Sequence, residues 1–316
     1  MEQSGNSDLV VNGVEVRYMP ASDLMVQKGL KYHDTFGLLP LLERLNFDLG
    51  AKRWDPVNLL LTGPKGNGKS LLLAYYAQQA GIPYLAIDCS EETKERHLKG
   101  GFIVKGGSTP FVLGTVANAI HVANQKGVAM LVFEEMNALS PQRQKELNAL
   151  TDFRKKLEIP ELSWRLELHP DARLFIAGTM NPSVYGGTYE LNEDLKSRFF
   201  EIEMPYPPAQ AEKQVLLSMM PGGSQIPHQL LDTLIAIAQQ TRQEQAGLGY
   251  ALSTRDLVEI LKSVSRVGWE DGLFLLAQKF SADDRKLVLD RVKDITKIVV
   301  HKDIKERAVT HRITNP

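Results

Sequence analysis

Residues 57–71 read VNLLLTGPKGNGKSL, and this stretch decides which fold the chain can adopt. Val57–Thr62 is a short apolar run of the kind that forms a buried strand. It leads directly into Gly63–Ser70, which matches the pattern G-x-x-x-x-G-K-[ST], and Lys69–Ala80 then has helical character. A strand, a glycine-rich loop and a helix in this order predict a loop whose backbone amides surround phosphate groups.

The residues of this loop have distinct expected roles. The loop amides and the positive end of the following helix attract phosphates. Lys69 is expected to reach the β- and γ-phosphate oxygens, and the Ser70 hydroxyl to ligate Mg²⁺. The alternative is a glycine-rich turn without a ligand. The motif favours ATP and Mg²⁺ as cofactors, with the nucleotide held by Gly63, Pro64, Lys65, Gly66, Asn67, Gly68, Lys69, Ser70 and Leu71.

Two acids follow a second apolar strand. The segment Leu131–Glu135 reads LVFEE, as in a Walker B motif, in which the first acid orders the Mg²⁺ shell and the second polarises the attacking water. We therefore expect Glu134 to be a metal residue and Glu135 a catalytic residue. The first acid is usually Asp, so Glu134 leaves slow hydrolysis open. The alternative is two solvated acids at a strand end.

Short apolar runs alternate with helical patterns through residues 57–204, after a strand-like piece at Leu9–Tyr18. Such alternation predicts an α/β fold, a mostly parallel sheet with helices on both faces. The alternating residues of Trp164–Leu168 indicate a hairpin inserted into it. The predicted strands are Val57–Thr62, Pro83–Asp88, Val128–Phe133, Arg173–Gly178 and Phe199–Met204, and the predicted helices are Leu24–Leu49, Lys69–Ala80, Phe111–Lys126 and Ser140–Asp152.

The composition changes after the Pro205–Pro208 stretch, where helical patterns take over. The predicted domains are an N-terminal segment (1–34), an α/β nucleotide-binding domain (35–208), a small helical lid domain (209–301) and a polar tail (302–316). A chain of 316 residues with 43% hydrophobic residues is long enough for such an arrangement.

Charge and cysteine content narrow the class of protein. The net charge of -1 provides no overall basic field, which argues weakly against a nucleic-acid partner. The single Cys89 cannot form an intramolecular disulfide, and no apolar run is long enough to span a bilayer. The first residues do not have the pattern of a secretory signal. We expect a cytoplasmic protein without a membrane partner.

The segments Gly178–Pro182 (GTMNP) and Gly186–Phe199 (GGTYELNEDLKSRF) resemble the AAA+ superfamily, in particular the CbbQ/NorQ-like members of its MoxR-type branch. The resemblance covers about residues 35–265. It implies a P-loop AAA+ fold followed by a helical lid, and a homo-oligomeric ring, expected to be a hexamer, that hydrolyses ATP. It also implies a client protein and, in some relatives, a von Willebrand factor A-domain partner.

Two catalytic residues follow from this resemblance. Asn181 corresponds to sensor 1, which positions the hydrolytic water with the Walker B glutamate; an Asn-Pro turn is the alternative. Arg198 corresponds to the arginine finger, inserted into a neighbouring subunit's ATP site. The alternative for Arg198 is a structural salt bridge with Glu193 or Asp194.

Two further features carry weaker expectations. Arg255 resembles sensor 2, a γ-phosphate contact at the start of a lid helix, unless Ser253 or Thr254 simply caps that helix. The loop Lys99–Ile103 is a candidate pore-facing loop, and Phe102 within it could equally pack in the core.

Three functions remain in view at this stage. The leading hypothesis is a ring-forming ATPase that remodels or activates a partner protein. An AAA+ motor on nucleic acid is the second, because Lys94, Arg96, Lys99 and Lys105 could line a basic pore. The third is an ATP-gated structural ring with weak hydrolysis, motivated by Glu134.

Overall fold

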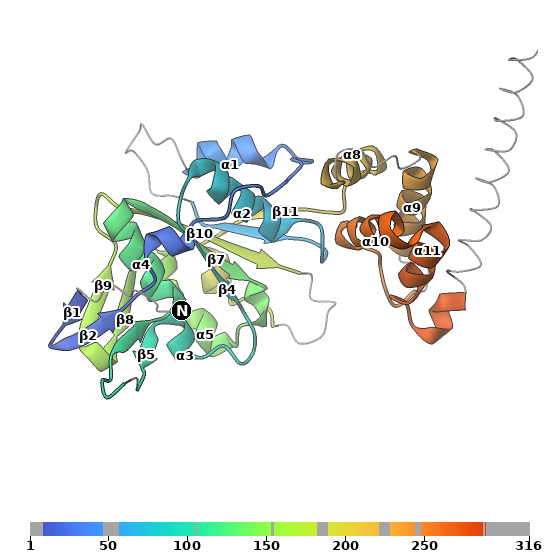
Figure 1. Cartoon of the computed structure of the whole chain (residues 1–316). Helices are drawn as coiled ribbons and strands as arrows, with labels where there is room; N and C mark the ends of the chain where they lie inside the picture. The colour runs from blue at the N-terminus through green and yellow to red at the C-terminus, as the bar shows by residue number, and fades with distance from the viewer. Residues whose placement is uncertain are drawn as a thin grey trace, which may run out of the picture. The chain divides into compact units, whose positions relative to one another are not determined.

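The computed structural model of the chain divides into two compact units (Figure 1). The first comprises residues 1–64 and 69–205, and the second comprises 65–68 and 206–316. In the described part of the chain no helix is both long and apolar enough to cross a membrane. The predicted tail, 302–316, lies outside the described residues, which are 9–46, 57–104, 106–152, 155–181, 189–220, 228–243, 248–286 and 288.

A five-stranded sheet forms the centre of the first unit, and all of its neighbouring strands are parallel. The strand order is β11-β3-β10-β7-β4, so the chain crosses over repeatedly between strands. The predicted parallel α/β sheet is therefore confirmed. Its strands are β3 (Leu59–Thr62), β4 (Tyr84–Asp88), β7 (Val128–Glu134), β10 (Arg173–Met180) and β11 (Phe200–Glu203).

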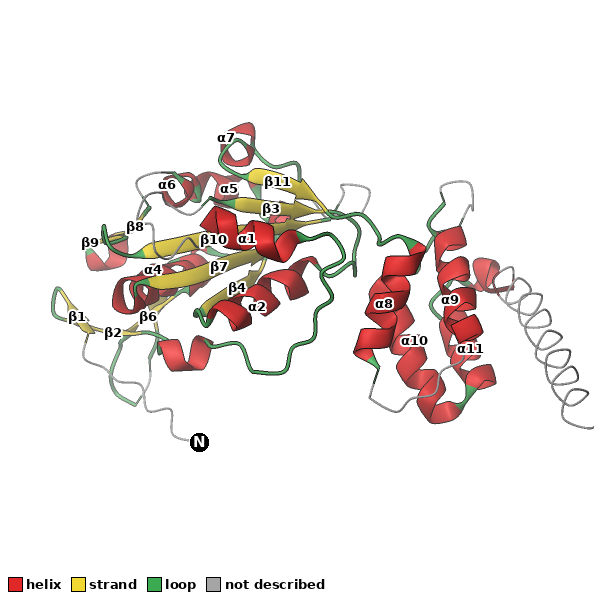
Figure 2. Ribbon diagram, turned by 90° about the horizontal axis from the view of Figure 1, so that it is seen from above, coloured by secondary structure: helices red, strands yellow, loops and turns green. Residues whose placement is uncertain are grey.

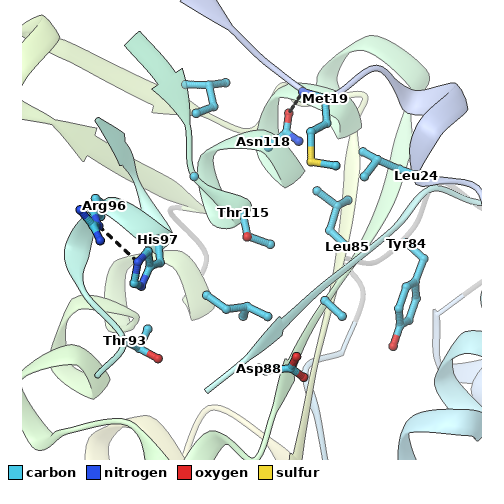
Figure 3. Close-up of a pocket in the computed structure, with 14 residues that line it drawn as sticks. Met19, Leu24, Tyr84, Leu85, Asp88, Thr93, Arg96, His97, Thr115 and Asn118 are labelled. Carbon is cyan, nitrogen blue, oxygen red and sulfur yellow. Dashed lines mark hydrogen bonds between the residues drawn. The ribbon is translucent and has the colours of Figure 1, made fainter. Parts of the chain in front are cut away.

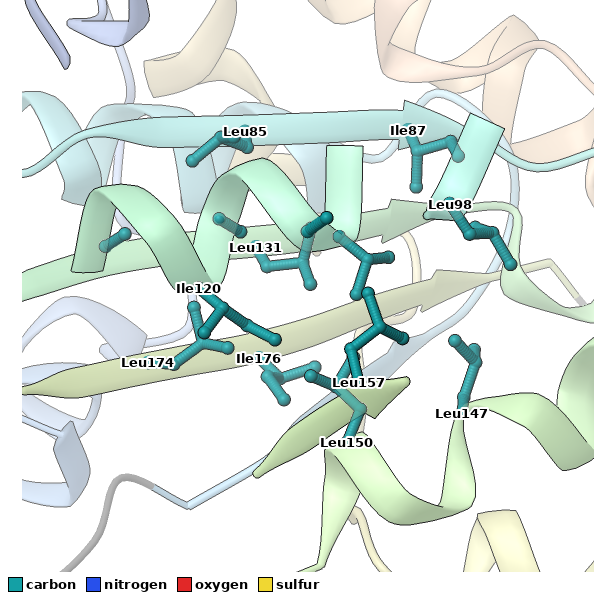
Figure 4. Packing of buried hydrophobic residues seen from close by; sticks show 14 of the residues in the cluster. Leu85, Ile87, Leu98, Ile120, Leu131, Leu147, Leu150, Leu157, Leu174 and Ile176 are labelled. Atoms are coloured by element: carbon teal, nitrogen blue, oxygen red, sulfur yellow. The ribbon is translucent and has the colours of Figure 1, made fainter. Parts of the chain in front are cut away.

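Both faces of this sheet are buried, because alternate residues of each strand point to opposite sides. Leu59 and Leu61 pack with α1 (Leu38–Asn46) and α2 (Lys69–Ala80), whereas Leu60 belongs to the cluster on the other face. On that face Ile120 of α4 (Thr115–Lys126) packs with Leu131, Leu174 and Ile176 (Figure 4). Figure 2 shows these helices around the strands. Burial on two faces explains why the strands are continuously apolar.

A second, four-stranded sheet has the order β1-β2-β6-β5. The hairpin between β1 (Leu9–Val11) and β2 (Val14–Arg17) turns at Asn12 and Gly13, whose φ angles of 49° and 81° fit a tight hairpin turn. The other strands are β5 (Gly100–Phe102) and β6 (Phe111–Leu113). The predicted helix from Phe111 is therefore wrong at its start: residues 111–113 pair with β2 and β5, and Gly114 is the N-cap of α4.

The predicted helix Leu24–Leu49 is also too long. Residues 21–24 form a 3-10 turn, and α1 begins only at Leu38. The Asp34 carboxylate accepts hydrogen bonds from the backbone amides of Leu38 and Leu39, both at 2.9 Å, and this capping fixes the start of the helix. Residues 47–49 lie outside the described residues.

The remaining elements of the first unit surround the sheet. The helix predicted from Ser140 is broken at Leu147, and Ser140 occupies the N-cap position without a side-chain cap bond. The predicted hairpin is confirmed, since β8 and β9 pair antiparallel. These elements are α3 (Glu95–Leu98), α5 (Pro141–Glu146), α6 (Asn148–Thr151), β8 (Lys156–Ile159), β9 (Trp164–Glu167) and α7 (Glu193–Lys196), with 3-10 turns at Met136–Ala138 and Pro160–Leu162.

The second unit is helical in its described part from residue 206 onward and has its own apolar core. Inside it the Arg242 guanidinium donates two hydrogen bonds, of 2.9 and 2.8 Å, to the fully buried Glu212 carboxylate. This bidentate pair keeps a buried charge compensated. The helices are α8 (Ala209–Met219), α9 (His228–Thr241), α10 (Thr254–Val267) and α11 (Trp269–Ala277).

Candidate active site

The predicted phosphate loop connects β3 to α2, as the sequence required. The side chain of Lys69 is buried, and its Nζ donates to the carbonyl oxygens of Gly63 and Pro64, both at 2.8 Å. It also donates to Asn181 Oδ1 at 3.1 Å. The loop therefore holds a fixed positive charge at its centre, at the position where β- and γ-phosphate oxygens would bind.

Residues 65–68 of the loop group with the second unit. Within that unit the Arg255 amide donates to the Gly66 carbonyl at 3.2 Å. Gly66 has a φ of 74°, and a Cβ there would lie 2.5 Å from Ser253 Oγ, so only glycine fits. Ser253 caps α10 through the amide of Asp256, which is the capping that the sequence allowed. The sensor 2 role of Arg255 stays a prediction.

The first acid of the predicted pair, Glu134, ends β7 and points at the phosphate loop. The Ser70 hydroxyl donates to Glu134 Oε2, and the Thr179 hydroxyl donates to the same oxygen at 2.7 Å. Ser70 and Glu134 thus bring together oxygen ligands of the kind that Mg²⁺ prefers. The longer Glu side chain reaches Ser70, and the donor chemistry fits the ion.

Tyr84 of β4 lies beside this carboxylate, with its hydroxyl 3.5 Å from Glu134 Oε1. Burial and the negative charge of Glu134 raise the pKa of Tyr84 well above its ordinary value. The phenol therefore keeps its proton and can donate to the carboxylate.

The second acid, Glu135, follows directly and has a left-handed backbone, with φ 53° and ψ 48°. Such a conformation costs a residue other than glycine about 1–3 kcal/mol unless its surroundings hold it. The Glu135 amide donates to Thr179 Oγ1 at 3.1 Å. Thr179 therefore contacts both acids at once, the side chain of Glu134 and the backbone of Glu135.

Asn181, at the carboxyl end of β10, connects Glu135 and the phosphate loop. Its Nδ2 donates to Glu135 Oε1 at 3.4 Å, while its Oδ1 accepts from Lys69 Nζ. The Asn137 side chain donates to the Asn181 carbonyl at 3.1 Å and holds the backbone in place. The structure brings together Lys69, Ser70, Glu134, Glu135 and Asn181. Pro182, needed for the alternative Asn-Pro turn, lies outside the described residues.

Arg198 is not part of this cluster. It lies just before β11, and since β11 and its neighbour β3 are parallel, the start of β11 is at the opposite end of the strands from the phosphate loop. Its guanidinium forms an ion pair with Asp152 at 3.7 Å. The alternative partners Glu193 and Asp194 are therefore wrong. Arg198 Nε is buried and has no hydrogen-bond partner among the described residues.

The candidate pore-facing loop is only partly in the core. The Phe102 side chain is 47% exposed and its ring packs edge-on against Phe111 at 5.3 Å. In the predicted basic set, Lys99 forms an ion pair with Glu95 at 2.6 Å, which reduces its free charge. Lys105 lies outside the described residues.

Sequence reasoning missed Thr179 and Tyr84. Thr179 is a polar residue in a strand that is otherwise apolar and buried, and it lies two positions before Asn181. A hydroxyl inside such a strand needs a hydrogen-bond partner, so its position was a usable signal. The sequence gives no comparable signal for Tyr84, because its contact with Glu134 depends on the pairing of β4 with β7.

Comparison with known proteins agrees with this geometry. Residues 58–199 match the AAA domain (dynein-related subfamily). The chain is 25% identical to protein CbbQ of Hydrogenophilus thermoluteolus, over 64% of this chain and 72% of that protein. It is 25% identical to protein NorQ of Paracoccus denitrificans, over 54% and 60%. The match to midasin of Dictyostelium discoideum is 28% identical over 74% of this chain but spans only 4% of midasin.

The family model covers the predicted site residues from Lys69 to Arg198, and the parallel sheet is the one that the sequence predicted. The family match over residues 58–199, the similarity to CbbQ and NorQ and the site geometry support an AAA+ ATPase of the MoxR type.

Proposed function

We propose that this chain binds ATP with Mg²⁺ and hydrolyses it as one subunit of a homo-oligomeric ring that remodels or activates a partner protein. The observation that carries the proposal is the Asn181 amide, which contacts Lys69 on one side and Glu135 on the other. An amide in that position can align a water molecule against a phosphate that Lys69 holds.

The proposed roles follow from these contacts. Lys69 and the loop amides bind the phosphates, and Ser70 with Glu134 would hold Mg²⁺, which neutralises phosphate charge. Glu135 accepts the proton of the attacking water, and Asn181 orients that water. Thr179 keeps both acids in place.

Arg198 supplies the final part from a neighbouring subunit. Arg198 lies at the end of the strands opposite the phosphate loop, so it does not reach the loop of its own chain. One guanidinium nitrogen is buried without a partner among the described residues. An arginine in trans stabilises the charge that develops on the transferred phosphoryl group. The hexamer remains the number that the resemblance implies.

The partner is proposed from the relatives rather than from the site. NirQ of Pseudomonas aeruginosa, 25% identical over 63% of this chain, is named a denitrification regulatory protein. The NirQ name suggests a regulatory role for this chain, and the resemblance to the MoxR-type branch suggests a von Willebrand factor A-domain partner or another client protein.

The test is ATP turnover measured against chain concentration, with particle mass from light scattering in the same samples. Turnover per chain should rise as the ring assembles and should fall strongly in Glu135→Gln. The exposed Glu161→Gln, in a 3-10 turn of the inserted hairpin, is the matched control and should turn over as wild type does.

Two other results would redirect the proposal. Tight binding of ATP with Mg²⁺, nucleotide-dependent assembly and almost no turnover would identify a nucleotide-gated ring, in which Glu134 does not support hydrolysis. Turnover stimulated by DNA or RNA in a salt-dependent way would identify a nucleic-acid motor. Turnover that is independent of assembly would contradict the shared site.

A further inference from the structure

A pocket of about 380 Å³ opens in the first unit, and its lining shares only Tyr84 with the site described above (Figure 3). All five residues of β4 line it, together with parts of α3, α4 and the segment from Met19 to Leu24. Its buried apolar lining consists of Leu24, Leu85, Ile87 and Leu113. The volume falls within the range of pockets that hold a small ligand or a short chain segment.

One wall of the pocket is a free strand edge. Within the described residues β4 pairs with β7 and with no other strand. The Pro83 carbonyl and the Cys89 amide bond to β7, so in this parallel ladder the main-chain groups of Tyr84, Ala86 and Asp88 face away from it. Ala86 and Asp88 are exposed. An edge of this kind can accept a further strand.

Asn118 of α4 offers an unused donor to the pocket. The residue is 1% exposed, and its Oδ1 accepts the Met19 amide at 3.2 Å, which fixes the orientation of the side-chain amide. Among the described residues nothing accepts a hydrogen bond from its Nδ2, although Asn118 lines the cavity. This amide donor is therefore available to an acceptor in the cavity.

The surroundings of Asn118 favour a negatively charged acceptor. The first turn of the twelve-residue helix α4 begins at Thr115, and its N-cap Gly114 provides no side-chain cap, so backbone amides remain available there. The exposed Arg96 and His97 stand on another wall of the pocket, and the exposed Asp88 stands at the end of β4 (Figure 3). Asp88 disfavours a second acid at its own end.

We propose that this pocket binds an extended peptide segment carrying one carboxylate side chain. The carboxylate accepts from Asn118 Nδ2 and the first turn of α4, and the peptide main chain lies along the outer edge of β4. Arg96 adds long-range attraction at the rim. A carboxylate fits better than a phosphate, because the floor is apolar and only two polar side chains of the lining, Asn118 and Thr93, are buried. The proposal concerns binding alone and does not depend on ATP turnover.

The experiment measures fluorescence polarisation of labelled eight-residue peptides with the full-length chain. The peptides alternate Val and Thr to favour an extended conformation, and one Glu is moved through the positions; a second panel has Gln in its place. At least one Glu register should bind roughly tenfold or more tightly than its Gln counterpart, the effect of one charge-assisted hydrogen bond. N-methylation of every second residue should abolish binding, since it removes strand pairing.

Asn118→Asp tests the donor. The new carboxylate still accepts the Met19 amide and suits a helix N-terminus, so folding should persist. The preference for Glu over Gln should be lost. Arg96→Ala should weaken binding and reduce its salt dependence, whereas Arg165→Ala, on the exposed hairpin strand β9, should not.

Several outcomes would overturn the proposal. Equal affinity for Glu and Gln peptides, or an unchanged preference in Asn118→Asp, excludes carboxylate recognition at this residue. Binding of glutarate alone with no gain from the peptide, or full binding of the N-methylated peptide, excludes strand pairing. Tighter binding of a single-stranded oligonucleotide than of every peptide identifies a phosphate site instead.

Discussion

Two polar regions of the first unit differ in how many of their side-chain hydrogen bonds and ion pairs are formed within the chain. At the carboxyl ends of β3, β7 and β10, Lys69, Glu134, Glu135 and Asn181 are linked to one another or to Thr179. At the start of β11, Arg198 has one ion pair at 3.7 Å and a buried Nε without a partner among the described residues. The contacts of the first region fit a nearly complete nucleotide site, and we propose that the second region is part of a site in a neighbouring subunit.

A site shared between subunits would place its catalytic charge in two different ways. Groups that bind nucleotide must be held before it arrives, because preorganised dipoles stabilise charge without reorganisation. An arginine that acts on a neighbour must instead stay accessible at an edge of the molecule. A single loose ion pair holds it without burying the whole guanidinium.

Arg198→Ala should lower ATP turnover more than any other variant. Turnover in the assembled ring should fall about a thousandfold, the lower end of the range for an arginine that acts in trans. ATP affinity and assembly should persist. Steady-state turnover and light scattering measure the two, with the exposed Arg266→Ala as control. An Arg198→Ala ring that turns over as wild type does would remove Arg198 from the site.

Glu135→Gln should lower turnover about a hundredfold, because the amide can no longer accept the proton of the attacking water. Its hydrogen bond with the Asn181 amide can be kept, so ATP binding should not weaken. Equilibrium binding of a fluorescent ATP analogue and single-turnover hydrolysis separate these effects. A loss of binding equal to the loss of turnover would mean that Glu135 acts on the nucleotide and not on the water.

Thr179→Val tests whether contacts among the residues of the first region keep Glu134 and Glu135 in place. The variant removes the hydroxyl shared by Glu134 and Glu135 but keeps the shape of the side chain. Turnover should fall about tenfold, since the half-buried Glu134 carboxylate loses one of its donors and the left-handed Glu135 loses a backbone contact. Thr179→Ser should restore most of it. Failure of Ser to restore turnover would assign Thr179 to packing alone.

Asp152→Asn should have the smallest effect. The ion pair with Arg198 is long, and Asn keeps the size of the Asp152 side chain and an oxygen that can accept from the guanidinium. Turnover should change by no more than about threefold. Steady-state turnover at saturating ATP measures it. A loss as large as that of Arg198→Ala would show that Asp152 positions the arginine and that the second region is more ordered than the contacts indicate.

Sequence reasoning predicted the local parts of this account. The phosphate loop, the two acids after β7 and Asn181 all lie directly beside an apolar strand, so periodicity and motif spacing located them. The parallel sheet followed from the alternation of strands and helices. These features depend on neighbours within a few residues.

The parts that were wrong or missed depend on distant segments. Phe111–Leu113 forms a strand because β2 lies beside it, and its apolar residues fit a helix equally well. Arg198 pairs with Asp152, not with the nearby Glu193 or Asp194 that were the alternative partners from the sequence. Thr179 serves Glu135 because β10 pairs with β7. Such contacts are set by strand order, which local patterns do not specify.

The most direct test of the shared site is to mix the two inactive variants. Glu135→Gln chains keep Arg198, and Arg198→Ala chains keep an intact phosphate site, so mixed rings contain some complete sites. In an equal mixture about a quarter of the interfaces should be complete, and turnover should recover to about that fraction of wild type. Turnover that stays at the level of the separate variants, in rings shown to be mixed by light scattering of size-tagged chains, would contradict the account.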